Sequence, residues 1–251
     1  MKTLAVIPAR LGATRLPRKP LRLLAGLPLV VRVAQRVAEM GVVDHCVVAT
    51  DSDEIASVVR EHGGEAALTR ADHPSGTDRV AEVAGRPEFS GYDVVVNVQG
   101  DEPFISDTVV AGIVDLIGMF ELSTAAVRVP PPAAILDDPN VVKVIANDDG
   151  QAMYFSRAPI PFLRDARDAS LRADQVWQHI GVYAYTPAAI ARWVALPVHS
   201  LERIERLEQL RPLAAGLRMG VFVSDEPVRP GIDTEADLER ANREWMDFST
   251  R

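Results

Sequence analysis

Hydrophobic residues in the first half of the chain alternate between short apolar runs and segments with helical spacing. The apolar runs predict strands at 3–8, 45–50, 65–69 and 92–98. Helical spacing follows the first run at Leu29, Val30, Val33, Val37 and Met40. Ser52 or Asp53 can cap the next helix, Gly63-Gly64 can end it, and a loop at 70–78 precedes a third helix. This alternation predicts a parallel sheet that helices cover on both faces.

After about residue 120 the regular alternation is lost. Strands are predicted at 123–129, 141–146, 151–156, 180–185 and 219–224. A helix is predicted at about 200–214, with its inward face formed by Leu201, Ile204, Leu207 and Leu210. Segment 163–176 is charged and weakly patterned, which indicates a surface loop, and a last helix is predicted at 234–247. We expect one α/β domain over residues 1–251, with a mostly parallel, Rossmann-like sheet and a mixed β insertion over its active edge.

Composition narrows the class of protein only moderately. The 251 residues are 47% hydrophobic and 25% charged, which is typical of a globular domain. The apolar runs are shorter than a membrane span requires, and no secretory signal is evident, so we expect a cytoplasmic protein without membrane contact. The single cysteine, Cys46, lies in a predicted strand and reads as a buried structural thiol. The net charge of -8 argues against nucleic-acid binding.

Positive charge is nevertheless concentrated at the start of the chain. The first 38 residues contain eight basic side chains and no acidic one, whereas the rest contain 19 basic and 35 acidic side chains. Such a segment resembles a transit peptide, but prolines at 8, 17, 20 and 28 would break the amphipathic helix that a transit peptide needs. We therefore interpret it as a basic loop at the end of a strand, suited to a small anionic ligand.

The basic loop offers the groups that bind a polyphosphate. Arg10, Arg15 and Lys19 lie close to Gly12 and Ala13, whose small side chains let a ligand approach the backbone. The spacing of a P-loop and the Gly-x-Gly-x-x-Gly pattern are both missing, so P-loop hydrolysis and dinucleotide binding are unsupported.

Two carboxylates are candidate Mg²⁺ ligands. Asp101 follows a buried strand in Gln99-Gly100-Asp101, at the strand end where a parallel sheet presents catalytic groups. Asp233 precedes the last predicted helix. Each residue can instead be a turn or helix cap, and this alternative is stronger for Asp233. The histidines lack zinc-site spacing, and His179 would by default be a structural strand residue.

Several motifs together resemble the 3-deoxy-manno-octulosonate (Kdo) cytidylyltransferases over nearly the whole chain. The motifs are Ile7-Pro8-Ala9-Arg10, Thr14-Arg15-Leu16-Pro17, Lys19-Pro20-Leu21, Thr69 to His73, Ser75-Gly76-Thr77-Asp78-Arg79, Asn97 to Pro103, Tyr154 to Arg157, Ile160-Pro161, His179-Ile180-Gly181, Leu207 to Arg211 and Gly231-Ile232-Asp233-Thr234. Each motif is weak alone, and their order along one chain makes the resemblance specific.

The resemblance implies that CTP and Kdo give CMP-Kdo and pyrophosphate, a step of lipopolysaccharide biosynthesis. Arg10, Arg15 and Lys19 would hold the triphosphate, Ser75, Gly76 and Thr77 would line the cytidine, and Asp101 and Asp233 would bind Mg²⁺. Lys19, Arg10 and the two aspartates would be the catalytic residues. The sugar acid would be surrounded by Gln99, Arg157, His179, Tyr185, Glu208 and Gln209. A homodimer is implied, with the insertion at about 120–200 forming the sugar site and the dimer contact.

Three positions depart from the family pattern. Ala13 stands where Ser is usual, Arg18 where Gly is usual, and Phe162 where Trp is common. Arg18 therefore either avoids positive φ or is strained. Alternative functions are a cytidylyltransferase for an amino-Kdo or for sialic acid, and a non-catalytic triphosphate-binding sensor, which the presence of both aspartates disfavours.

Overall fold

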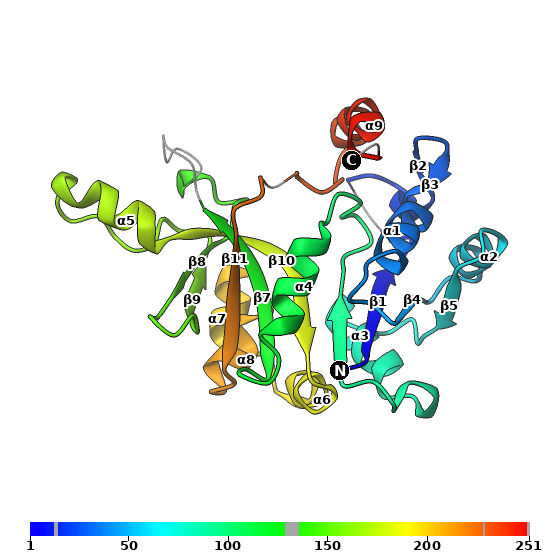
Figure 1. Cartoon of the computed structure of the whole chain (residues 1–251), viewed down its shortest axis with the longest axis horizontal. Coiled ribbons are helices and arrows are strands. Elements are labelled where there is room, and N and C mark those ends of the chain that lie inside the picture. The colour runs from blue at the N-terminus through cyan, green and yellow to red at the C-terminus, as the bar shows by residue number, and fades with distance from the viewer. Residues whose placement is uncertain (13–14, 129–135, 228, 250–251) are drawn as a thin grey trace. The chain divides into compact units, whose positions relative to one another are not determined.

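The chain forms two compact units. The computed structural model describes residues 1–12, 15–128, 136–227 and 229–249 (Figure 1). The first unit comprises Met1–Val110 and Arg229–Arg251, and the second comprises Ala111–Val228. We expected a single domain with an insertion at about 120–200, and the second unit begins earlier and ends later than that. Of the positions singled out in the sequence, Ala13, Thr14 and the last residue of the strand predicted at 123–129 lie outside the described residues.

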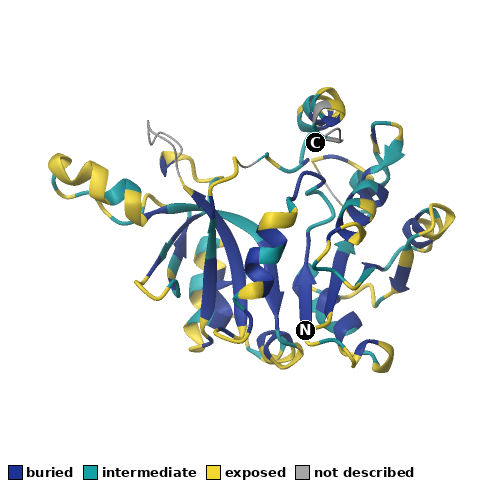
Figure 2. Ribbon diagram, in the orientation of Figure 1, coloured by how far each residue is buried: buried dark blue, intermediate teal, exposed yellow. Residues whose placement is uncertain are grey.

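A parallel sheet forms the centre of the first unit. Its strands are β1 (Thr3–Ala9), β4 (His45–Thr50), β5 (Glu65–Leu68) and β6 (Val94–Asn97), in the spatial order β6-β1-β4-β5. β1 pairs in parallel with β4 and with β6, so that Leu4 lies opposite His45 and Thr3 lies opposite Val94. Every residue of β1 except Pro8 is buried (Figure 2). The predicted parallel sheet of apolar strands is confirmed.

Helices connect and cover these strands. The helices of the first unit are α1 (Leu29–Ala38), α2 (Asp53–Glu61), α3 (Gly76–Ala84) and α9 (Glu235–Ser249), and α4 (Asp107–Asp115) begins there. The short elements are η1 (Lys19–Leu21), η2 (Pro87–Phe89) and the hairpin of β2 (Leu23–Leu24) and β3 (Leu27–Pro28). Ser52 caps α2 by accepting a hydrogen bond from the Ile55 amide, as predicted, and Gly63 with φ 79° follows its end.

The second unit contains a mixed sheet. Its strands are β7 (Leu122–Arg128), β8 (Lys143–Ala146), β9 (Ala152–Ser156), β10 (Trp177–Tyr185) and β11 (Met219–Ser224). β7 pairs in parallel with β11 and antiparallel with β10, and β8 pairs antiparallel with β10 and β9. Its helical elements are η4 (Ala166–Asp168), α5 (Ala169–Gln175), α6 (Pro187–Ala195), α7 (Ser200–Glu205) and α8 (Leu210–Ala214).

Three sequence predictions of secondary structure are wrong. The expected surface loop at 163–176 contains α5, whose residues are good helix formers with no buried member. The expected helix at 200–214 is broken at Arg206, which has φ 56°, and Ile204 is exposed rather than inward. Pro212 explains the break, because its ring would clash with the carbonyl of residue 208 in a continuous helix. The expected loop at 70–78 ends earlier, because α3 begins at Gly76.

No helix in the described part of the chain is long and apolar enough to cross a membrane. Cys46 is only partly buried, whereas its position in a strand predicted a buried thiol. Its surroundings raise its pKa to about 12, through burial first and through the charge of Glu65 second.

Candidate active site

A pocket of about 350 Å³ lies at the carboxyl ends of β1 and β6 in the first unit. The two strands are parallel neighbours, so the segments that follow them meet at one edge of the sheet. The pocket is lined by Pro8, Ala9, Arg10, Gly12, Arg15, Leu16, Lys19, Pro20, His73, Ser75, Gly76, Arg79, Gln99, Gly100, Asp101 and Asp233. Gly100 is needed for this approach, since a Cβ there would lie 3.0 Å from the Pro8 carbonyl oxygen.

One ammonium group joins the two predicted metal ligands. The Lys19 Nζ lies 2.5 Å from Asp101 Oδ2 and 3.0 Å from Asp233 Oδ1. The two carboxylate oxygens are therefore no farther apart than the sum of these distances, about 5.5 Å. Burial alone would lower the pKa of Lys19, but the charge and hydrogen bond of Asp101, with those of Asp233, outweigh it and raise that pKa. Lys19 is thus a firmly protonated cation.

Asp233 is free to face the pocket because its neighbours cap the following helix. Thr234 Oγ1 accepts a hydrogen bond from the Asp237 amide at 3.2 Å, and Asp237 Oδ2 accepts from the Thr234 amide at 3.0 Å. This reciprocal capping box removes the alternative reading of Asp233 as the cap. The Ile232 amide also donates to the Asp101 carbonyl at 3.0 Å, which ties the two aspartate segments together.

The carboxyl of Glu102 lies beside this pair and is affected by its charges. Glu102, next to Asp101, has a pKa raised to about 8 by burial and by the charges of Asp101 and Asp233, against the opposing effect of Lys19. Arg15 reaches Asp233 at 3.0 Å, but 67% of its side chain is exposed, so this ion pair is weak.

Arg18 adopts the conformation that the family pattern assigns to glycine. Its backbone has φ 56° and ψ 31°, in the left-handed region, directly before η1. A non-glycine residue there stores about 1–2 kcal/mol of strain. The Arg18 side chain points to Glu54 on α2, where both side chains are about half exposed. Of the two readings of Arg18, the strained one is correct.

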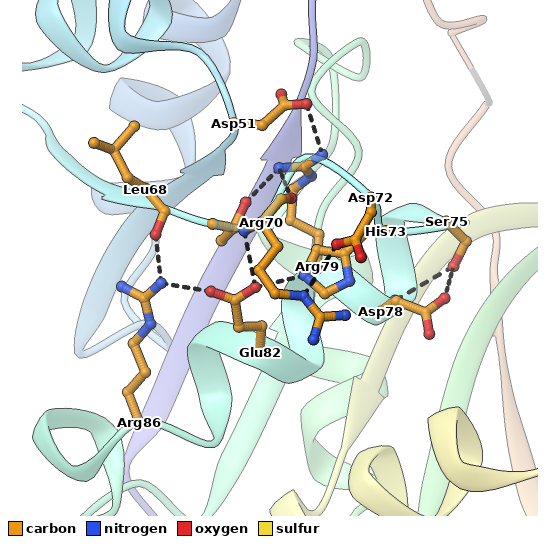
Figure 3. Close-up of polar contacts among 11 residues, drawn as sticks. Asp51, Leu68, Arg70, Asp72, His73, Ser75, Asp78, Arg79, Glu82 and Arg86 are labelled. Carbon is orange, nitrogen blue, oxygen red and sulfur yellow. Dashed lines mark hydrogen bonds and ion pairs between the residues drawn. The ribbon is translucent and has the colours of Figure 1, made fainter.

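The other wall of the pocket is a network of charged side chains on α3 and the loop before it (Figure 3). Arg79 lines the pocket and is almost fully buried; its guanidinium contacts Asp51 at 3.3 Å and donates to Thr69 Oγ1. His73 also lines the pocket, and its Nε2 lies 2.5 Å from Glu82 Oε2. The network therefore fixes the positions of the Arg79 and His73 side chains at the pocket wall.

Glu82 is the anionic centre of that network. Burial alone would raise its pKa, but hydrogen bonds from His73, from the Arg70 amide and from Arg86 lower the pKa to about 2. It stays ionised at neutral pH, and the positions of His73 and Arg86 depend on it. Figure 3 shows Arg70 and His73 on the loop before α3, Glu82 on α3 and Arg86 on the segment after it.

Of the three residues predicted to line the cytidine, two line the pocket and one does not. Ser75 and Gly76 line the pocket, whereas Thr77 is 7% exposed and outside its lining. The Ser75 hydroxyl caps α3 by accepting from the Asp78 amide at 3.3 Å and donates to Asp78 Oδ2 at 2.7 Å. A Cβ at Gly76 would contact the Pro8 ring at 3.4 Å. The turn thus presents backbone and small side chains, as expected for a surface that contacts a flat base.

Of the predicted sugar residues, Gln99 lies in this pocket and the others belong to the second unit. Arg157 follows β9, and its Nε donates to the Glu205 carbonyl at 2.8 Å. Glu208 and Gln209 lie on the turn between α7 and α8, and Gln209 is 4% exposed. His179 on β10 contacts Thr124 Oγ1 through Nε2 at 2.8 Å. Burial lowers the pKa of His179 to about 3, so the ring is neutral.

Tyr183, which the sequence analysis did not select, lies beside both His179 and Tyr185 and is also buried. The Tyr183 ring centroid lies 5.5 Å from that of His179, and the charge of Glu208 contributes to the raised pKa of Tyr183, after burial and Tyr185. Tyr185 is fully buried, and its ring packs edge-on against Trp193. The role predicted for Tyr185 stays a prediction that its burial does not favour. The i, i+4 spacing of His179 and Tyr183 was available in the sequence.

Comparison with known proteins agrees with this arrangement of motifs. The sequence model of the Cytidylyltransferase family matches residues 4–220. A 3-deoxy-manno-octulosonate cytidylyltransferase of Gemmatimonas aurantiaca is 60% identical over 247 residues, covering 98% of this chain and 95% of the relative. One of Leptothrix cholodnii is 46% identical, covering 96% and 90%. The chain belongs to the 3-deoxy-manno-octulosonate cytidylyltransferase family.

Solved structures show that the family fold extends over the whole chain. CMP:2-keto-3-deoxy-manno-octonic acid synthetase complexed with CTP matches with a TM-score of 0.88 at 36% identity, covering 98% of this chain and 99% of the other. A 4-diphosphocytidyl-2C-methyl-D-erythritol synthase from Anaerococcus prevotii, with a TM-score of 0.64 at 16% identity, shares the fold. The mixed α/β fold with a mostly parallel sheet is thus that of the cytidylyltransferases.

The Mg²⁺ site predicted from the sequence has two carboxylate ligands, Asp101 and Asp233. In the described part of the chain, no three His, Cys, Asp or Glu side chains converge into a metal cage. Mg²⁺ commonly takes one or two carboxylates and completes its octahedron with phosphate oxygens and water. Asp101 and Asp233, with oxygens within about 5.5 Å, match the ligand type and the charge that such an ion takes.

Proposed function

We propose that the chain transfers CMP from CTP to the anomeric hydroxyl of Kdo, giving CMP-Kdo and pyrophosphate. The observation that carries this proposal is the convergence of Arg10, Arg15, Lys19, Asp101 and Asp233 on one pocket at the sheet edge. The family membership and the likeness to a synthetase complexed with CTP support the choice of nucleotide.

The reaction is a displacement at the α-phosphorus of CTP. The sugar hydroxyl oxygen forms the new bond to phosphorus, the bond from the α-phosphorus to the bridging oxygen breaks, and the hydroxyl proton passes to solvent. Negative charge grows on the oxygens of the α-phosphate and of the departing pyrophosphate. Lys19, which Asp101 and Asp233 hold, and Arg10, which lines the same pocket, would be the cations that stabilise this charge. Stabilisation of this kind accounts for a large part of the rate enhancement.

Asp101 and Asp233 would hold Mg²⁺. When bound, the ion would supply Lewis-acid polarisation of the phosphate oxygens. Asp101 is anchored through the tie between its carbonyl and Ile232, and Asp233 through the capped start of α9. Both carboxylates are therefore presented from fixed backbone.

The base would be read on the wall formed by Ser75, Gly76 and Arg79. Arg79 is almost fully buried and is held by Thr69 and Asp51, so its remaining N–H groups have a fixed direction. A rigid donor lining a pocket suits the carbonyl oxygen of a pyrimidine. The wall is also short, since Gly76 lies against Pro8, and this leaves less room for a purine.

The second unit would bind the sugar acid, with Arg157 facing its carboxylate. It would also form a homodimer. Large apolar side chains are exposed there at Phe162 (87%), Ile204 (76%), Leu171 (64%) and Met153 (60%). Light scattering should give twice the monomer mass, and a monomer at micromolar concentration would refute the dimer.

Pyrophosphate release from each of four nucleoside triphosphates, with Kdo, an amino-Kdo and sialic acid in turn, tests the function. We expect release with CTP and Kdo. Release with an amino-Kdo in place of Kdo would change the sugar assignment. No release from CTP with any of these acids would refute the proposed transfer.

A further inference from the structure

Arg157 is held at both its backbone and its side chain within the second unit. Its amide donates to Glu205 Oε2 at 2.9 Å, its Nε donates to the Glu205 carbonyl at 2.8 Å, and its Nη1 donates to the Pro139 carbonyl at 2.9 Å. Its own carbonyl accepts from Lys143 Nζ at 2.5 Å. Two of the five guanidinium N–H groups are thus used, and three have no partner among the described residues.

Lys143 is a fully buried cation that cannot itself bind a ligand. Its side chain is 0% exposed, and its ammonium donates to the carbonyls of Asp138 at 3.0 Å, Val141 at 2.7 Å and Arg157 at 2.5 Å. An ammonium has three N–H donors, and all three are used here. Lys143 therefore joins the loop before β8, which carries the Pro139 carbonyl, to the backbone of Arg157.

Glu205 connects the same site to the turn between α7 and α8. Its Oε1 accepts from the Ser156 hydroxyl at 2.6 Å, while its Oε2 binds the Arg157 amide. Glu205 is the last residue of α7, and Arg206 with φ 56° directs the chain into the turn that carries Glu208. One carboxylate therefore fixes the end of β9 against this turn.

We propose that Glu205 and Lys143 are positioning residues that orient the Arg157 guanidinium for the carboxylate of the acid sugar. This inference rests on the role given to Arg157 in the proposed function. Neither side chain needs to touch the sugar. Immobilising a long side chain on binding costs about 0.5–1.5 kcal/mol, which corresponds to about a twofold to twelvefold change in affinity. Here that ordering is already made, because two fixed carbonyls hold Nε and Nη1.

The test compares Michaelis constants for the two substrates in a pyrophosphate-release assay. Glu205→Gln keeps size and shape but cannot accept from both Ser156 and the Arg157 amide. We expect it to raise the KM for Kdo about tenfold and to leave the KM for CTP within twofold. Glu205→Asp should restore part of the loss, and Glu226→Gln, at an exposed position of the same unit, should change neither constant.

Two further measurements separate positioning from general destabilisation. First, Glu205→Gln in an Arg157→Ala background should add less than twofold to the KM for Kdo, because the residue to be oriented is gone. Second, the wild type should prefer Kdo over the analogue in which a carboxamide replaces the C1 carboxylate. This preference should be smaller in Glu205→Gln and in Lys143→Met. Thermal melting checks that each variant is folded at the assay temperature.

The outcomes distinguish this inference from the proposed function. An unchanged KM for Kdo in Glu205→Gln, equal rises for both substrates, or a full tenfold effect on top of Arg157→Ala would overturn the positioning role. If Arg157→Ala left the KM for Kdo unchanged, the assignment of Arg157 would fail together with this inference, while transfer from CTP would stand. A wild type without transfer from CTP to Kdo would instead refute the proposed function itself.

Discussion

Replacing Lys19 by methionine should change metal binding and turnover in opposite directions. Lys19 Nζ lies between Asp101 and Asp233, and 18% of its side chain is exposed. Methionine keeps the length of the side chain and removes the charge. Two carboxylates with oxygens at most about 5.5 Å apart then repel each other by at least about 1–3 kcal/mol, for an effective dielectric constant between those of water and of a protein surface.

A divalent cation would relieve that repulsion without competition from the ammonium. We therefore expect Lys19→Met to bind Mg²⁺ about tenfold more tightly in the absence of nucleotide, measured by titration calorimetry. Turnover should fall about 100- to 1,000-fold, because a lost transition-state donor costs about 3–4 kcal/mol. Lys2→Met, which removes an exposed lysine, is the matched control and should change neither quantity.

Two results would refute this reasoning. Turnover near that of the wild type would remove Lys19 from the stabilisation of phosphate charge. Weaker Mg²⁺ binding in Lys19→Met would show that the ammonium does not compete with the ion, and that the two carboxylates do not form the metal site.

Three further sets of substitutions test separate parts of the structure. Arg18→Gly should change the free energy of unfolding by less than about 1 kcal/mol, because relief of left-handed strain is offset by the greater freedom of glycine in the unfolded chain. The same substitution should leave turnover unchanged, and a loss of activity would contradict the peripheral position of Arg18. Asp101→Asn and Asp233→Asn should each abolish most activity in a folded protein, and the double variant should be little worse than either, whereas multiplied losses would argue against a shared ion. The pKa of His179 is lowered to about 3, so below about pH 6.5 the unfolded chain binds a proton at this ring and the folded chain does not; the free energy of unfolding should therefore decrease as the pH is lowered from about 6.5. In denaturant titrations, His179→Gln should weaken this pH dependence, whereas the control His62→Gln, at an exposed position, should not. Equal pH dependence in His179→Gln and the wild type would refute the assignment.

Apolar patterning predicted the strands better than any other feature. β4 and β11 begin and end at the predicted residues, because each is a nearly continuous run of apolar and small side chains bounded by polar ones. The pattern failed where backbone sterics decide. Leucine and isoleucine recur at helical spacing through 201–210, yet Pro212 and the left-handed Arg206 divide the segment into two helices. Pro212, inside the expected helix, could have predicted this break from the sequence alone.

The candidate site was predictable from motifs in part only. Residues next to strand ends, such as Arg10 and Asp101, could be placed at the sheet edge from topology alone. Arg79 and His73 lie in quoted motifs but received no role, because the sequence does not show that Glu82 and Asp51 hold them toward the pocket. No sequence pattern pointed to Glu205, because its role depends on a hydrogen bond from the Arg157 amide, 48 residues earlier in the chain.

The pairing of Lys19 with Asp233 shows where local sequence reasoning ends. The two residues are 214 positions apart, and they meet because α9 packs against the segment that follows the basic loop. Arg22 forms a double hydrogen bond with Glu235 at the start of α9, at 2.8 and 2.5 Å, and the Ala25 amide donates to Asn242 at 2.8 Å. Periodicity identifies α9 as a helix but says nothing about its partner. The second carboxylate of the proposed metal site therefore depends on tertiary docking, and that docking is what completes a site begun by the first strand.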